Sequence, residues 1–341
     1  MDAYGQVADR LADGFSDVTF SAFPDGSIDH FCGVHDGDER VRDRADFAAA
    51  VAAGRDSFAV RRRRTELGGQ AVNAARQAHA LAADVTLVGH LDDERFSLPF
   101  RTASMGRPSE VTVLSFESDD LMLARESPDV QEWTFADLRA AAPDGVERLL
   151  GADAVWCGNW ATMPNQSDAL RAISALDVDP AAFVFDPGPM TGASDRRIEE
   201  LLDALGRLAG NVPVVVSVNG EEANRLASAV GSDADRPGRL RDVRADTGAA
   251  VVEHEVDAAL AATGAGVVRV PNLSTETVVS DTGGGDRFGA GLALARAAGW
   301  DWPLALALGN ACASYYVGAG ESGDATALRG HVADRTPVQR E

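Results

Sequence analysis

The stretch DTGGGDRFGAGLALARAAG, Asp281 to Gly299, places three consecutive glycines and an aspartate directly before an apolar, alanine-rich run that predicts a helix. Glycine permits the positive φ values that turn backbone N–H groups inward. The first N–H groups of a helix have no intrahelical partner, and the helix dipole adds positive potential there. Gly283, Gly284 and Gly285 therefore predict a pocket for anionic oxygens that needs no cationic side chain.

Asp286, which follows these glycines, has two interpretations. Aspartate is a favoured N-cap residue, so the glycines would form a tight turn and Asp286 would cap the helix. Alternatively, a carboxylate beside an anion pocket accepts the proton of a hydroxyl that attacks a phosphoryl group, while backbone N–H groups stabilise the phosphoryl charge. Because a carboxylate repels bound phosphate, this second interpretation calls for Mg²⁺ to neutralise the phosphates. The segment alone leaves both open.

Composition and charge exclude several classes of protein. The chain has 341 residues, 45% of them apolar, which suits one large α/β domain or one domain with a small appendage. Asp and Glu number 53 against 31 Lys and Arg, which gives a net charge of −22. Such a surface repels nucleic acid and anionic membranes, so neither is expected as a partner. It is typical of proteins from a salt-rich cytoplasm, where the Debye length is about 3 Å at 1 M salt, so a halophilic source is expected.

The rarer residues constrain chemistry and location. All basic residues are arginines, and without lysine a Walker-type phosphate loop and Schiff-base catalysis are excluded. Cys32, Cys157 and Cys312 form no C-x-x-C pair and are expected to be buried, in a reducing cytoplasm. The acidic N-terminal stretch has no apolar core typical of a signal peptide. The apolar segment 300–320 contains Asp, Pro and Asn, which predicts a buried helix rather than a membrane span.

Short apolar runs alternate with alanine-rich helical stretches along most of the chain. Strands that are apolar throughout and separated by helices predict a parallel sheet covered on both faces. The predicted strands are 84–91, 152–158, 181–187, 212–218 and 248–254. Residues about 26–66 and 99–128 instead contain short strand-like pieces without a long helix between them, which predicts a small projecting β-sheet that serves as a lid. The polar stretch 231–242 predicts a loop, and one domain spans 1–341.

Three motifs together resemble those of the ribokinase-like (PfkB) sugar kinases. DTGGGDRFGAG resembles the C-terminal motif of that family; GGQAVNAARQAHALAADVTLVGHLDDE (68–94) is similar to its N-terminal Gly-Gly block, and VNGEEANRL (218–226) to its N-x-x-E element. They occur in the family's order, and the resemblance covers about residues 18–320. It implies a three-layer α/β/α domain with a mainly parallel central sheet and a small β-sheet lid. It also implies transfer of a phosphoryl group from ATP, with Mg²⁺, to a sugar hydroxyl.

The resemblance implies roles for particular residues. Asp286 would be the catalytic base, and Gly283, Gly284 and Gly285 would form the anion hole. Asn219 and Glu222 would organise Mg²⁺ and its water shell at the nucleotide phosphates; the alternative is a loop asparagine and the N-cap region of a helix. Asn310 would lie on a helix against the adenine, or alternatively be a helix-packing amide. The residues that would face the sugar are Gly68, Gly69, Gln70, Asn73 and Asp29. Asp25 is an alternative to Asp29 as the aspartate that binds the sugar hydroxyls.

The sequence also departs from the family pattern. Where the family carries T-x-G-x-x-G, this chain has Glu253 and His254, which leaves ATP or ADP open as the donor, with ATP favoured. His254 itself is expected to be packed or exposed rather than catalytic. The run Arg61–Arg64 would alternate between two strand faces, and with Arg107 it could bind a phosphate already on the substrate, such as ribose 1-phosphate. The alternative, which is favoured, is a solvated arginine surface.

The sequence thus predicts a cytoplasmic, ATP- and Mg²⁺-dependent kinase of a sugar or a close relative. Alternatives on the same fold are a nucleoside kinase, an ADP-dependent sugar kinase and a catalytically silent sugar-binding regulator. A dinucleotide oxidoreductase is disfavoured because no G-x-G-x-x-G follows the first strand. Exposed edges of the lid strands make a homodimer through the lid plausible.

Overall fold

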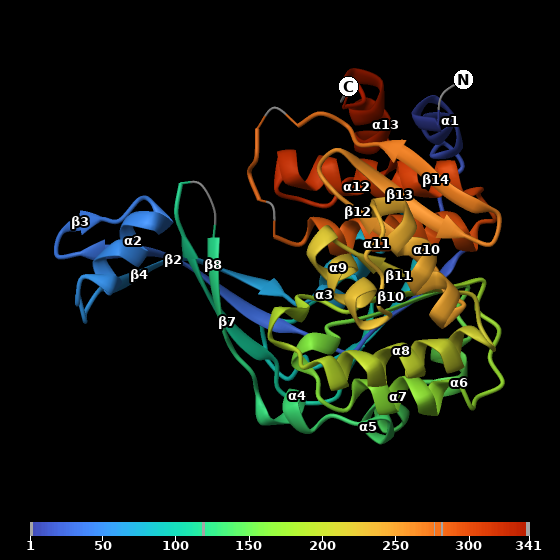
Figure 1. Ribbon diagram of the computed structural model, residues 1–341, viewed down its shortest axis with the longest axis horizontal. Helices are drawn as coiled ribbons and strands as arrows, with labels where there is room; N and C mark the ends of the chain where they lie inside the picture. Colours follow the sequence, from blue (N-terminus) through green and yellow to red (C-terminus); the bar gives the residue numbers. More distant parts are fainter. Residues whose placement is uncertain (1–2, 118–119, 276, 281, 339–341) are drawn as a thin grey trace.

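A nine-stranded sheet forms the centre of the protein in the computed structural model, which describes residues 3–117, 120–275, 277–280 and 282–338 (Figure 1). Its strand order is β14-β13-β12-β11-β10-β9-β1-β5-β6, and neighbours are parallel except for the antiparallel pairs β12–β13 and β13–β14. The strands are β1 (Thr19–Phe23), β5 (Asp84–Gly89), β6 (Arg101–Ser104), β9 (Ala154–Gly158), β10 (Ala182–Asp186), β11 (Val214–Val218), β12 (Ala250–His254), β13 (Ala258–Thr263) and β14 (Gly266–Pro271).

Helices cover both faces of this sheet, which confirms the predicted three layers. One face carries α1 (Ala3–Arg10), α3 (Gln70–Ala80), α11 (Gly284–Ala297), α12 (Trp302–Ala319) and α13 (Ala325–Asp334). The other carries α4 (Pro128–Glu132), α5 (Phe135–Ala141), α6 (Val146–Leu150), α7 (Gln166–Ile173), α8 (Asp195–Ala209), α9 (Gly220–Ala229) and α10 (Arg236–Thr247). Every residue of β9, β10 and β11 is buried, as expected of strands enclosed on two sides.

Two sequence-based expectations about burial are also met. Cys32, Cys157 and Cys312 are all buried and unpaired. The apolar segment 300–320 forms α12, whose middle is packed in the core beside α11. Within the described part of the chain, no helix combines the length and the apolar character needed to cross a membrane.

The lid is a second, smaller sheet that projects from the main body (Figure 1). It comprises β2 (Ser27–Asp36), β3 (Glu39–Arg40), β4 (Ala59–Gly68), β7 (Ser109–Ser115) and β8 (Asp120–Arg125). β2 pairs with β7 in parallel and with β3 and β4 antiparallel. A nine-residue helix, α2 (Arg44–Ala52), lies between β3 and β4, and its Phe47 packs on Phe58 and Phe116.

The predicted lid boundaries need correction at 99–128. The first strand of that region, β6, pairs with β5 and extends the main sheet, so the second lid segment begins at β7. Positions 118 and 119, between β7 and β8, lie outside the described residues. The alternation expected for Arg61–Arg64 is also wrong, because a β-bulge opposite Phe31 and Cys32 inserts Arg63 as an extra residue.

The loop predicted for 231–242 is wrong beyond Asp235, where α10 begins. The Asp235 side chain accepts a hydrogen bond from the Gly238 backbone N–H at 2.9 Å, and Pro237 occupies the first turn. Both features favour a helix start. Only Leu240, Val243 and Thr247 of this helix are buried, so its apolar periodicity is too sparse to reveal it from the sequence.

Candidate active site

Polar side chains stand at the carboxyl ends of five neighbouring strands of the main sheet, β1, β9, β10, β11 and β12. In open parallel sheets, ligands bind in the crevice outside these ends. Helices α3 and α11, which carry the predicted motifs, begin at the same edge. The residues are Asp25, Asn159, Asp186, Asn219 and His254.

Asp286 lies in the first turn of α11 and is only 5% exposed. The N-cap of this helix is Gly283, with φ of +92° and no capping side chain, so the N-cap interpretation of Asp286 is wrong. The carboxylate Oδ2 instead accepts a hydrogen bond from Asn73 Nδ2 at 2.8 Å, which joins α11 to α3. A Cβ at Gly283 would collide with the Arg287 guanidinium, so both the φ angle and the space require glycine there. Asp281 lies outside the described residues.

Arg287 fixes this glycine turn and was not anticipated from the sequence. Its side chain is buried, its guanidinium lies 3.8 Å from the centre of the Tyr316 ring, and Nη1 donates to the Gly283 carbonyl at 2.9 Å. The only signal in the sequence is its position directly after Asp286. These contacts hold the Arg287 guanidinium against the glycine turn.

Three buried carboxyl groups raise one another's pKa at this edge of the sheet. Burial raises the pKa of Asp286 to about 7, the charge of Asp186 adds to it, and Arg287 and Asn73 oppose it. Burial and the charge of Glu222 raise the pKa of Asp186. Burial, with the charges of Glu221 and Asp286, also raises the pKa of Glu222. A carboxylate whose pKa lies near neutral pH is suited to general base catalysis.

Asp186 is the main site residue that the sequence analysis missed. Its Oδ1 accepts hydrogen bonds from the Gly188 N–H at 3.0 Å and from Gln70 Nε2 at 3.3 Å. A signal was available in the sequence: Asp186 stands at the end of an apolar strand, just as Asn219 directly follows one. Asn159, after β9, is a second missed residue: it has a left-handed φ of +61°, and its Nδ2 donates to Asp25 at 3.1 Å.

The two aspartates proposed for the sugar differ in what they contact. Asp25 accepts hydrogen bonds from the N–H groups of Gln70 and Ala71, both at 2.8 Å, and thereby caps α3. Burial raises its pKa, although these two bonds oppose the rise. Asp29 is less buried, accepts a hydrogen bond from Ser27 at 2.6 Å, and has its pKa raised by burial to about 6. Asp29 is therefore the more available of the two for a ligand.

The glycine pair beside these aspartates is required by close contacts. A Cβ at Gly68 would overlap the carboxylate of Asp29. Gly69 has φ of +101°, and a Cβ there would lie 2.7 Å from the Cα of Gly26. The predicted sugar-facing residues Gly68, Gly69, Gln70, Asn73 and Asp29 are thus brought together around the start of α3.

Asn219 and Glu222 form a reciprocal capping box at the start of α9. The Asn219 side chain accepts from the Glu222 N–H, and Glu222 Oε2 accepts from the Asn219 N–H, both at 2.9 Å. Among the described residues, no three His, Cys, Asp or Glu side chains could hold a metal ion. Magnesium commonly uses one or two carboxylates, water and substrate phosphates, so this donor set fits Mg²⁺ held through water but not an all-protein cage.

Asn310 makes the contacts of the packing alternative. It is 1% exposed on α12, and its Nδ2 donates to Tyr4 Oη at 3.1 Å and to the Val270 carbonyl at 3.4 Å. It therefore ties α12 to α1 and β14.

Two of the arginines considered for a substrate phosphate, Arg64 and Arg107, have other partners. Arg64 lies 3.6 Å from the centre of the Phe31 ring and pairs with Glu66 at 2.6 Å. Arg107 pairs with Asp129 at 3.2 Å. Both guanidinium groups are about half exposed or more, in line with the solvated alternative.

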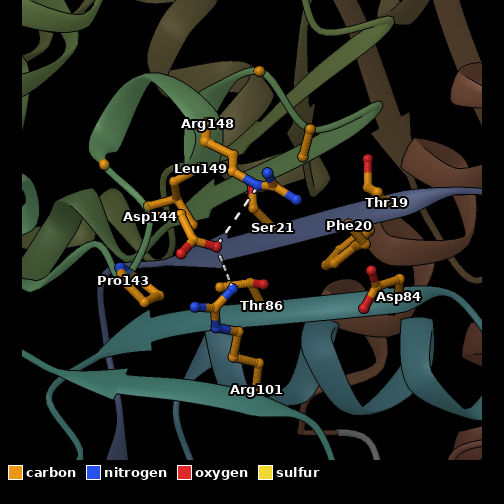
Figure 2. A pocket seen from close by; sticks show the side chains of 13 residues that line it. Thr19, Phe20, Ser21, Asp84, Thr86, Arg101, Pro143, Asp144, Arg148 and Leu149 are labelled. Atoms are coloured by element: carbon orange, nitrogen blue, oxygen red, sulfur yellow. Dashed lines mark hydrogen bonds and ion pairs between the residues drawn. The ribbon is translucent and has the colours of Figure 1, made fainter.

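A separate pocket of about 310 Å³ lies at the opposite edge of the sheet (Figure 2). It is lined by the first residues of β1 and β5, including Thr19 and Asp84, whereas the site above lies where these strands end. Arg101 and Arg148 reach Asp144 there, at 2.5 and 3.7 Å. This pocket is therefore distinct from the candidate active site.

Comparison with solved structures agrees with this fold. Ribokinase from Thermotoga maritima superposes with a TM-score of 0.67 at 13% identity, over 93% of this chain and 100% of that one. A probable sugar kinase from Rhizobium etli gives 0.67 at 16% identity, over 94% of this chain and 98% of that one. The fold is therefore that of the ribokinase-like kinases. A family model described as prokaryotic ketohexokinase matches residues 29–335. The chain belongs to this family of carbohydrate kinases, which transfer a phosphoryl group to an alcohol.

Sequence similarity to a ketohexokinase supports the same assignment. The ketohexokinase of Haloferax volcanii is 29% identical over 275 residues, which cover 74% of this chain and 71% of that protein. These comparisons confirm the prediction that the protein is a sugar kinase. They give no support to ribose 1-phosphate as the acceptor.

Proposed function

We propose that this protein transfers the γ-phosphoryl group of ATP, with Mg²⁺, to a hydroxyl of a ketohexose such as fructose. The observation that carries the chemistry is Asp286, held in the first turn of α11 behind Gly283–Gly285 and hydrogen-bonded to Asn73. The acceptor class rests on the family and on the name of the Haloferax volcanii relative.

In the proposed reaction, the Asp286 carboxylate takes the proton of the acceptor hydroxyl. The hydroxyl oxygen then bonds to the γ-phosphorus, and the bond from that phosphorus to the bridging oxygen breaks, leaving ADP. The N–H groups at Gly283–Gly285 donate to the phosphoryl oxygens during transfer. Asn73 holds one carboxylate oxygen, which leaves the other for the proton. Glu222 and Asn219 would hold Mg²⁺ through water, and the ion would supply neutralisation of phosphate charge.

The acceptor would lie between the start of α3 and the root of the lid. Asp29 would accept hydrogen bonds from sugar hydroxyls, and Gln70 offers a side-chain oxygen that has no hydrogen-bond partner in the described part of the chain. Gly68 and Gly69 leave room for the sugar to approach the backbone. The lid would exclude water, so that ATP is not hydrolysed instead.

A donor and acceptor screen tests this proposal. Release of nucleoside diphosphate or monophosphate would be measured in molar KCl with ATP, GTP or ADP as donor. The acceptors would be fructose, other ketohexoses, aldohexoses, ribose, adenosine, inosine and fructose phosphates. We expect the highest kcat/KM for ATP with a ketohexose. A preference for a nucleoside, or for ADP as donor, would contradict the proposal, and no turnover with any pair would favour a sugar-binding regulator.

A further inference from the structure

His254 places an unused polar atom beside the first turn of α11. It is the last residue of β12, and its Nε2 is buried without a hydrogen-bond partner among the described residues. Buried polar atoms are nearly always paired, so an unpaired one calls for a reason. A Cβ built on Gly285 would lie 3.1 Å from His254 Cε1, 3.4 Å from Nε2 and 4.0 Å from Asp186 Oδ2. The absence of a side chain at Gly285 is therefore what lets the imidazole edge lie against the first turn of α11.

The imidazole ring is held in this position from several directions. Its centre lies 4.9 Å from that of the Phe288 ring on α11. The preceding residue, Glu253, is fully buried and paired with Arg236 and Arg239 on α10. The following residue, Glu255, accepts a hydrogen bond from the Gly220 N–H at 2.7 Å. Contacts with α9, α10 and α11 thus hold the end of β12 at the first turn of α11.

Charge in this region favours a neutral donor. The buried acids Asp186, Glu222 and Asp286 already interact with one another at this edge of the sheet, and Arg287 contacts Tyr316 and the Gly283 carbonyl. Burial lowers the pKa of His254 to about 4, so the ring is neutral at neutral pH and carries one N–H. The hydrogen bonds available to the two ring nitrogens decide which of them holds the proton. A phosphoryl oxygen only accepts hydrogen bonds, so a phosphoryl group at the pocket selects the Nε2–H form.

We propose that His254 Nε2–H donates a hydrogen bond to the phosphoryl group held at the start of α11. His254 then adds a side-chain donor to the backbone donors at Gly283–Gly285. This inference rests on the proposed phosphoryl transfer at this site and extends it to a residue that the sequence analysis expected to be only packed or exposed.

The first test uses inorganic phosphate and no nucleotide or sugar. The ring nitrogens of His254 would be followed by ¹⁵N NMR, with the signal assigned by its loss in His254→Leu. We expect phosphate to move the Nε2 resonance toward that of a hydrogen-bonded N–H, together with the Gly285 amide. An unchanged His254 signal overturns the proposal, whether or not the Gly285 amide moves.

The second test measures binding of a non-hydrolysable ATP analogue and of AMP by calorimetry. His254→Leu keeps apolar contact with Phe288 but removes the donor, and we expect about 10- to 100-fold weaker binding of the analogue, as for a hydrogen bond to a charged group. AMP, which lacks the terminal phosphates, should bind within about twofold of wild type. His254→Gln, which retains an N–H, should recover most of the loss, and exposed His79→Leu on α3 is the matched control.

Equal binding of the analogue by wild type and His254→Leu overturns the proposal, and so does an equal loss for AMP. Neither test contains an acceptor, so an error in the sugar assignment leaves the result intact. If wild type responds to phosphate but not to the ATP analogue, the donor in the proposed function is wrong and the role of His254 stands.

Discussion

Asp286 must be ionised to accept a proton, yet its burial near Asp186 raises its pKa to about 7. The hydrogen bond from Asn73 and the charge of Arg287 oppose this rise and favour the ionised carboxylate. A base with this pKa takes a proton more readily than an exposed aspartate, while it remains substantially ionised near pH 7.

Asp286→Asn is expected to lower kcat by about 10²–10⁴, the usual contribution of a general base. The amide cannot take the proton, but its oxygen can still accept from Asn73, so the fold should persist. Turnover would be measured with the best acceptor, and retained affinity for the ATP analogue would be the control. Near-full turnover in this variant would remove Asp286 from the mechanism.

The activity should rise with pH through the pKa of Asp286. Because only the ionised carboxylate accepts a proton, kcat/KM should fall about tenfold for each pH unit below about 7 and level off above it. Initial rates between pH 5.5 and 8.5 would measure this. A flat profile in wild type contradicts the role of Asp286, and Asp286→Asn should lose the dependence on this group.

At the residue level, the sequence is most informative where one local segment forms the feature. Gly283–Gly285 and Asp286 are adjacent, so the glycine turn and the helix that follows it could be predicted from a single stretch. Asp186 and His254 could not be placed beside them, because only the parallel sheet brings the ends of β10 and β12 next to α11. Arg287 was missed for a different reason: its role depends on Tyr316, which lies on another helix.

Among the elements, the five predicted strands were recognisable as apolar runs, and β9, β10 and β11 are buried at every residue. The hairpin of β13 and β14 was not predicted, since its alanine-rich first strand reads equally well as a helix. Helix α10 was hidden by its polar composition, although it contributes Arg236 and Arg239 to the buried Glu253.

Glu253→Ala tests how firmly α10 is attached to β12. The side chain of Glu253 is fully buried, so its removal takes the carboxylate partner from Arg239 and one of two carboxylate partners from Arg236. We expect the free energy of unfolding to fall by about 3–5 kcal/mol. The control is Glu200→Ala, which breaks the exposed pair with Arg196 within α8 and should cost less than about 1 kcal/mol. Urea unfolding of both variants would be compared, and similar losses would contradict a special role for the buried pair.

Over the whole molecule, a net charge of −22 is borne mostly on the surface. Its self-repulsion destabilises the compact state, and salt screens it. The free energy of unfolding should therefore rise between 0.2 and about 2 M KCl. Urea titrations would measure it, with glycerol at matched osmolality as the non-ionic control. An equal gain in glycerol would show that charge screening is not the cause.

A homodimer through the lid stays a prediction for the whole molecule. Edge strands β4 and β8 expose Val60, Met122 and Leu123, each about half accessible. Sedimentation equilibrium should show a dimer that is weakened by Leu123→Glu, whereas Val256→Glu, on the exposed turn after β12, should leave it intact. A monomer at all concentrations would contradict this assembly.

The contact between Asp29 and Gly68 has a mechanical consequence. Ser27 pairs with Gly68 and Asp29 with Glu66, so the Asp29 carboxylate, which we propose contacts the acceptor, lies where β2 and β4 leave the main body. Binding of the acceptor at Asp29 and the angle of the lid relative to the main body would then be coupled. An acceptor large enough to displace Asp29 would also displace β4 at Gly68 and hold the lid open. Water would then enter the site before the phosphoryl group is transferred, and such an acceptor would be a poor substrate.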